Sequence, residues 1–178
     1  MDDRLRDLAK ASPNCGILYR HQPLLALYGA LAELNVFSNS NAAQVQAGRF
    51  GDVLAEELVT RTGLRVAGCR QVDRLRALTD TGALTPEVHD AFDRLRRDRN
   101  LAAHAHLFDT TRALEAVRLA YELGVFHHRD RLDRPGGAGH RSRPRRVSAA
   151  TAARRQGGRE HHTDPRGAPG APSACTSA

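Results

Sequence analysis

The amino-acid sequence predicts an all-α protein, a compact antiparallel helical bundle over residues 1–129 followed by a disordered tail over residues 130–178. Three observations support this fold class. Apolar residues recur three and four positions apart in several segments, no segment alternates like a half-buried strand, and the composition changes abruptly after Arg129. A length of 178 residues allows one domain of ordinary size around a single core.

A first helix is expected to begin at Pro23, because proline suits the first position of a helix. The spacing of the apolar residues that follow predicts one broad apolar face, made of Leu24, Leu25, Leu27, Tyr28, Leu31 and Leu34.

The polar stretch 38–41 offers capping side chains to a second helix, which Gly63 is expected to end. Its inward face is predicted to hold Ala43, Ala47, Phe50, Leu54 and Leu58. Gly48 and Gly51 lower the helix propensity of this segment, so we expect them to permit close packing against a neighbour.

Three more helices complete the predicted bundle. One carries Val72, Leu75 and Leu78 and ends at Thr81-Gly82. The next starts with Thr85-Pro86-Glu87, which supplies a cap, a first-position proline and an acidic first turn. Its inward face is predicted to hold Val88, Ala91, Phe92 and Leu95. The last follows the capping segment Asp109-Thr110-Thr111; one stripe holds Leu114, Val117, Tyr121 and Val125, while a second, close contact is offered by Ala113, Ala116 and Ala120.

The segment after Arg129 is dominated by Arg, Pro, Gly and Ala. From Asp133 onward it contains one Val and no Leu, Ile or aromatic residue, so it cannot bury enough apolar surface to offset the entropy of ordering. A slipped reading frame is an alternative origin for this tail. Residues 1–129 hold 17 basic against 16 acidic side chains and the tail 10 against 4, so the net charge of +7 says little about nucleic-acid binding by the folded part.

Several classes of function are disfavoured. The only lysine, Lys10, lies outside any Gly-rich loop, so this chain has neither a phosphate loop for ATP nor the lysine of a restriction-type nuclease core. The most apolar stretch, residues 24–32, is far shorter than the roughly 20 residues that span a bilayer, so we expect no membrane contact.

We also expect no cofactor and no metal site. The chain has three cysteines, Cys15, Cys69 and Cys175. Their odd number and wide spacing predict neither disulfides nor a zinc site and favour a cytoplasmic location. The histidine pairs 104/106 and 127/128 diverge on a helix, so neither pair forms a chelate alone.

Residues 41–129 resemble a known family through five segments, whose order and intervals are more specific than any one of them: Arg49-Phe50-Gly51-Asp52-Val53-Leu54-Ala55, Gln71-Val72-Asp73-Arg74-Leu75, Leu84-Thr85-Pro86, residues 92–104 and residues 119–129. The family is the helical domain of unknown function that precedes the motor in R subunits of type I restriction endonucleases and in related helicases, which is counted among the HEPN folds. The sequence departs from its pattern at Gly48, where the family has an arginine and this chain has Arg49 next to it, and at Arg99, where the family usually has a small residue.

The resemblance implies a candidate site at Arg99, Asn100 and His104. Catalytic HEPN proteins carry an Arg-x4-6-His motif, and many are metal-independent ribonucleases that act as dimers. A histidine can transfer a proton at the 2′-hydroxyl while an arginine stabilises phosphoryl oxygens, and Asn100 can position either group. In an unbroken helix, however, His104 lies about 140° from Arg99 and His106 within about 20° of it, so His106 is the alternative partner.

Three functions are therefore carried forward. The first is an accessory module of a restriction-modification R subunit, truncated or frame-shifted here, that docks to other subunits or contacts RNA or DNA without an ATPase or DNA-nuclease site of its own. The second is a stand-alone, toxin-like HEPN ribonuclease, acting as a homodimer with Arg99 and His104. The third is a protein-interaction bundle, in which Arg99, Asn100 and His104 only fasten helices together. The basic residues Arg94, Arg96 and Arg97 are interpreted as a solvated helix face with local ion pairs.

Overall fold

Helices that reverse direction along the chain form the described part of the protein, which comprises residues 2–68, 70–104 and 108–133 of a computed structural model. The elements in chain order are α1 (Asp3–Ala11), the 3-10 helix η1 (Gly16–Arg20), α2 (Pro23–Asn35), α3 (Ser40–Thr62), α4 (Gln71–Asp80), α5 (Pro86–His104) and α6 (Thr110–Asp133). No strand occurs in these residues, so the predicted all-α class and bundle are confirmed.

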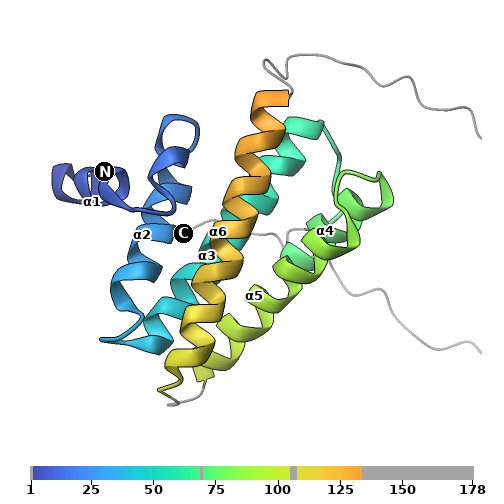
Figure 1. Ribbon diagram of the computed structural model, residues 1–178. Helices are drawn as coiled ribbons and strands as arrows, with labels where there is room; N and C mark the ends of the chain where they lie inside the picture. Colours follow the sequence, from blue (N-terminus) through green and yellow to red (C-terminus); the bar gives the residue numbers. More distant parts are fainter. Residues whose placement is uncertain (1, 69, 105–107, 134–178) are drawn as a thin grey trace, which may run out of the picture. The chain divides into compact units, whose positions relative to one another are not determined.

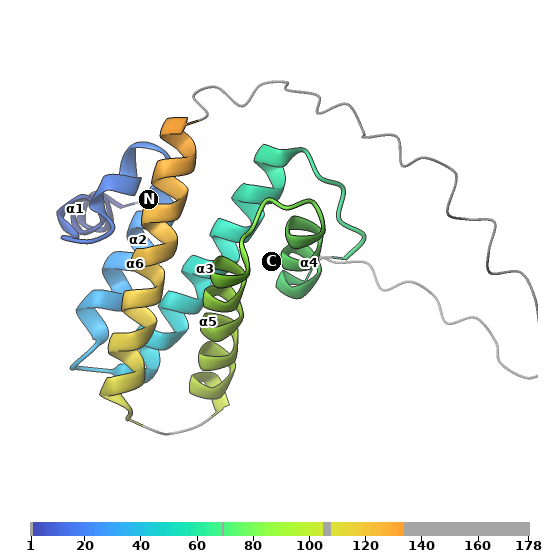
Figure 2. The same ribbon diagram turned by 45° about the vertical axis from the view of Figure 1, so that its right-hand side comes forward.

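The long helix α3 organises the bundle. It packs against α2, α5 and α6. In Figure 1 α6 crosses in front of α3, and Figure 2 shows α3 with α5 on one side and with α2 and α6 on the other. Phe50 of α3 and Phe92 of α5 are fully buried at the centre, surrounded by leucines of every other helix except α1. The core therefore lies around α3, and the contacts of α3 with its neighbours determine which of its side chains reach the surface.

The predicted helix ends are confirmed by their capping contacts. The Asn39 side chain accepts a hydrogen bond from the Ala42 amide at 3.0 Å at the start of α3, and Asp109 accepts one from Arg112 at 2.9 Å at the start of α6. Thr85 caps α5 through the amide of Val88 at 3.4 Å. Gly63 ends α3 with a positive φ of 67°, a conformation that glycine adopts without strain.

The buried face of α6 differs from the predicted one. Leu114 and Tyr121 of the predicted stripe are 48% and 42% exposed, whereas the alanine face is fully buried at Ala113 and Ala116. A Cβ atom added to Gly124 would lie 3.1 Å from a Leu18 methyl carbon, so the small side chains let α6 approach its neighbours closely. Leu24 and Leu34 at the ends of the predicted α2 face are likewise exposed.

Two further differences concern the ends of the domain. The elements α1 and η1 precede the first helix that the sequence pattern predicted, and only Ala9 of α1 is buried, which explains its weak signal. Helix α6 continues past Arg129, because Asp130 and Arg131 pair with side chains of α3. The rest of the expected tail lies outside the described residues. None of the described helices has the length and apolarity needed to cross a lipid bilayer.

Candidate functional site

Helix α5 carries Arg99, Asn100 and His104 and runs without interruption from Pro86 to His104. At 100° per residue, the Arg99 and His104 side chains leave this helix about 140° apart. His104 is exposed in the last turn, and among the described residues no hydrogen bond or ion pair joins it to Arg99. His106, the alternative partner, lies outside the described residues. Within one chain, the structure therefore does not bring Arg99 and His104 together.

Arg99 instead lies across helix α3, directly over Gly48. A Cβ atom added to Gly48 would approach the Cβ of Arg99 and would lie 2.6 Å from its Cδ. Such distances are shorter than any van der Waals contact, so only glycine at position 48 leaves room for the Arg99 stem. Positions 48 and 99 are thus in direct contact.

The guanidinium of Arg99 forms an ion pair and a hydrogen bond with the Asp52 carboxylate, one helical turn beyond Gly48. Burial nevertheless raises the pKa of Asp52 above its ordinary value, although the charges of Arg99, Arg74 and Arg49 act to lower it. The attraction between Asp52 and Arg99 therefore does not fully compensate the carboxylate for the water it has lost.

These residues line an open groove of about 470 Å³ over α3, with α2 on one side and α5 on the other. Its polar lining is Arg49, Asp52, Arg99 and Asn100, and its apolar lining is Tyr28, Val45, Val53 and Ala103. None of the eight is fully buried. Two of the three predicted site residues, Arg99 and Asn100, thus share one surface.

Arg49 differs from most arginines of the domain. Within residues 2–68, 70–104 and 108–133, its guanidinium makes no hydrogen bond or ion pair, and the side chain is exposed. Neither Arg49 nor Asp52 was a candidate from the sequence. Asp52 follows Gly48 by four residues and therefore lies on the same face of the helix. This spacing was the available signal that Asp52 could meet whatever residue packs on Gly48.

The other arginines of α5 form local pairs, as predicted. Arg96 donates to Asp93 at 2.7 Å, Arg97 lies 3.3 Å from the same carboxylate, and Arg94 donates to Asp98 at 3.2 Å. Asp98 is buried and also lies 3.8 Å from Arg112, which joins α5 to α6. These arginines therefore serve the solvated face and the helix packing.

A second polar cluster joins the C-terminal halves of α3 and α6. Arg61 pairs with Asp130 at 2.9 Å, and Arg131 pairs with Glu57, which also accepts a hydrogen bond from Gln22 at 3.4 Å. His127 lies fully buried beneath these pairs. Burial, together with the charges of the two arginines, lowers its pKa to about 4.

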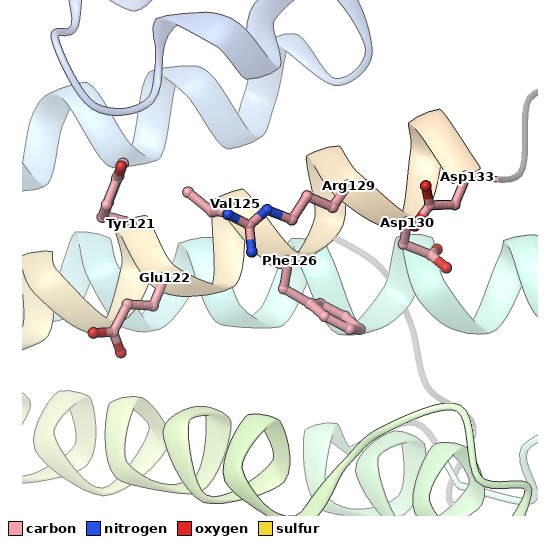
Figure 3. A pocket seen from close by; sticks show the side chains of 7 residues that line it. All are labelled: Tyr121, Glu122, Val125, Phe126, Arg129, Asp130 and Asp133. Atoms are coloured by element: carbon pink, nitrogen blue, oxygen red, sulfur yellow. The ribbon is translucent and has the colours of Figure 1, made fainter.

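Neither this cluster nor its surroundings resemble a binding site. A hollow of about 570 Å³ lies nearby, but Figure 3 shows that its seven labelled side chains all project from α6, with Tyr121 and Glu122 pointing in opposite directions. It is the outer surface of one helix. In the described part of the chain, no group of three or more His, Cys, Asp or Glu residues is placed to hold a metal ion.

Comparisons of the chain with protein-family models, with curated protein sequences and with solved structures found no match. Any functional assignment therefore depends on the residues themselves.

Proposed function

We propose that this chain is an accessory docking module, similar to the helical domain of type I restriction-modification R subunits, and that it contacts a partner subunit without cleaving RNA itself. The observation that carries this proposal is the pairing of Arg99 with Asp52 across helix α3. A catalytic arginine and its histidine must converge on one phosphoryl group, whereas Arg99 turns to Asp52 and leaves the helix about 140° from His104.

The composition of the groove also favours docking. Half of its lining is apolar, and its two arginines are offset by one aspartate, which gives a net charge of +1. Strong nucleic-acid binding requires several phosphates to be neutralised at once. A groove of this kind suits a protein segment better than a nucleic-acid backbone.

Copurification tests the docking proposal. The tagged full-length chain, coexpressed with the subunits of a restriction-modification system from its own source, should retain at least one of them at moderate salt. An exchange at the groove, Arg99→Ala, should weaken that retention, whereas Arg97→Ala on the outer face of α5 should leave it unchanged. Failure of the wild-type chain to retain any subunit would contradict the proposal.

The second candidate is the ribonuclease. Because His104 is exposed at the end of α5, this function is compatible only with an active site shared between two copies of the chain. His104 of one copy would have to meet Arg99 of another. Labelled RNA incubated with the wild-type chain in EDTA should remain intact if the docking proposal is correct. Cleavage that is lost in Arg99→Ala and in His104→Ala, and recovered when these two variants are mixed, would establish the shared dimeric site instead.

A further inference from the structure

We propose that the groove over α3 binds an amphipathic, acidic peptide segment of the partner protein, and that a carboxylate of this segment takes the place of Asp52 on Arg99. This inference rests on the docking function proposed above and names the chemistry of the partner. Its starting observation is that Arg49 and Arg99 line one groove from two different helices, with Asp52 between them.

The available charge in the groove is Arg49. It has no ion-pair partner among the described residues, while the other arginine already has one in Asp52. A guanidinium binds a carboxylate through paired, charge-assisted hydrogen bonds. One incoming carboxylate can therefore be held by Arg49 at first contact, before any internal pair is broken.

Asp52 is suited to be displaced. Both side chains of its ion pair are partly exposed, 24% for Arg99 and 34% for Asp52, so a ligand can reach them. Burial raises the pKa of the Asp52 carboxyl group in spite of the neighbouring arginines, so the pair does not fully offset the hydration that the carboxylate has lost. When a second carboxylate reaches Arg99, Asp52 stays within the field of Arg74 of α4, whose charge already acts to lower its pKa. The exchange replaces one ion pair by another and leaves no guanidinium unpaired.

The apolar half of the groove specifies the rest of the ligand. Tyr28 belongs to α2, and Val45 lies near the start of α3. Val53 and Ala103 complete the apolar lining. An amphipathic helix that docks in a groove places apolar side chains at i, i+3 and i+4, with charged ones between them. The volume of about 470 Å³ fits a few such side chains, and the partly exposed walls suit a segment that lies along the surface.

A nucleic acid fits these observations less well. An RNA strand carries one phosphate per nucleotide, so it would bring several negative charges toward Asp52 and toward Glu56, which is 66% exposed one turn further along α3. An acidic peptide can offer one carboxylate to Arg49 and one to Arg99 without placing further charges near Asp52 and Glu56. The peptide is therefore the occupant to which the proposal commits.

The test uses the full-length chain and a synthetic, fluorescein-labelled peptide of about 14 residues with Leu at i, i+3 and i+4 and Glu between them. Fluorescence anisotropy should show saturable binding, and the same peptide with Gln in place of Glu should bind at least about fivefold more weakly, as expected for the loss of one charge-assisted hydrogen bond. Arg49→Ala and Arg99→Ala should each weaken binding by a similar factor. Arg97→Ala is the control and should leave it unchanged.

The decisive variant is Asp52→Asn. If Asp52 competes for Arg99, removing its charge should tighten peptide binding by about threefold or more, a change that a merely structural role would not produce. Glu56→Gln removes a carboxylate one turn away, outside the groove lining, and should change the affinity by less than about twofold, as a screened rim charge does. Circular dichroism of every variant checks that the helices are retained.

Three results would overturn the inference. They are peptide binding that Arg49→Ala leaves unchanged, weaker binding by Asp52→Asn, and binding of a single-stranded RNA oligonucleotide in the absence of peptide binding. The docking function is judged separately. If restriction subunits copurify equally with the wild type and with Arg49→Ala and Arg99→Ala, docking is supported but the groove is not the contact surface. If the peptide binds as expected but no subunit copurifies, the partner belongs to another system.

Discussion

Helix α3 meets α5 and α6 in two different ways. Toward α6, the contact is closed by small side chains, by a buried histidine and by two ion pairs, Arg61–Asp130 and Glu57–Arg131. Toward α5, glycine lets the helices approach, but the ion pair Asp52–Arg99 lies on an open groove beside Arg49, which pairs with no side chain in the described part of the chain. Charged residues therefore join α3 to both neighbours, and the pair toward α5 shares its groove with a second arginine.

The comparison shows why an ion pair alone does not identify a site. Glu57 accepts hydrogen bonds from Gln22 and Arg131, and its side chain is only 15% exposed, so its pair fastens α6. Asp52 holds one arginine while its own burial raises its pKa. The neighbouring space, and the balance between burial and attraction, distinguish the pair that can be exchanged from the pair that cannot.

The largest expected effect is on the closed side and depends on pH. The pKa of His127 falls from 6.5 to about 4 on folding, so only the unfolded chain takes up this proton between those values. Its contribution to stability is therefore fully present above pH 6.5 and is lost as the pH falls toward 4. Between pH 7.5 and 5 the free energy of unfolding should drop by about 2 kcal/mol from this group.

The His127→Leu variant should lack this part of the pH dependence. Urea unfolding at several pH values measures it, and His89→Leu, at a solvent-accessible position of α5, is the control for the loss of a histidine. If the wild-type and His127→Leu curves run parallel from pH 7.5 to 5, the buried imidazole does not have the proposed role.

The next effect compares the two carboxylates. Glu57→Gln removes the negative charge that pairs with Arg131 and weakens the hydrogen bond with Gln22. It should therefore lower the free energy of unfolding by about 1–2 kcal/mol at pH 7. Asp52→Asn should cost less than about 0.5 kcal/mol, because it also removes a poorly compensated buried charge. Chemical denaturation of both variants gives the order, and equal losses would remove the distinction between the two sides.

The smallest effect is expected on the outer face of α5. Arg97→Ala removes a pair with Asp93 in which the arginine side chain is 63% exposed. Exposed pairs of this type contribute little, so the free energy of unfolding should change by less than about 0.5 kcal/mol. A loss above 1 kcal/mol in thermal unfolding would show that this face has an undescribed packing role.

The parts of the fold that depend on neighbouring residues were predictable from the sequence. The caps at Asn39, Thr85 and Asp109 and the glycine at position 63 were recognised, because each one satisfies backbone groups a few residues away. For α6, the predicted close contact at its alanines is confirmed, whereas Leu114 and Tyr121 of the predicted apolar stripe are exposed. The alanines are buried because α3 packs against them, and a single-helix pattern contains no information about that packing.

The same limit applies to the candidate site. Arg99 was singled out by its spacing from His104, but its partner in the structure, Asp52, lies 47 residues away on another helix. The close packing expected of Gly48 and Gly51 is confirmed; a Cβ at Gly51 would lie 3.3 Å from Gln71 of α4. What the sequence did not indicate is which side chain uses the space at Gly48, because this depends on the register of α3 against α5.

The stability of a Gly48 and Arg99 double-mutant cycle tests the central claim, that Arg99 lies on Gly48 and is thereby directed into the groove. Gly48→Ala alone should lower the free energy of unfolding by about 1–3 kcal/mol, because the added methyl group meets the Arg99 stem. In the Arg99→Gly background the same exchange should raise it by up to about 1 kcal/mol, since alanine is the better helix former. Equal destabilisation in both backgrounds would contradict the contact and the groove built on it.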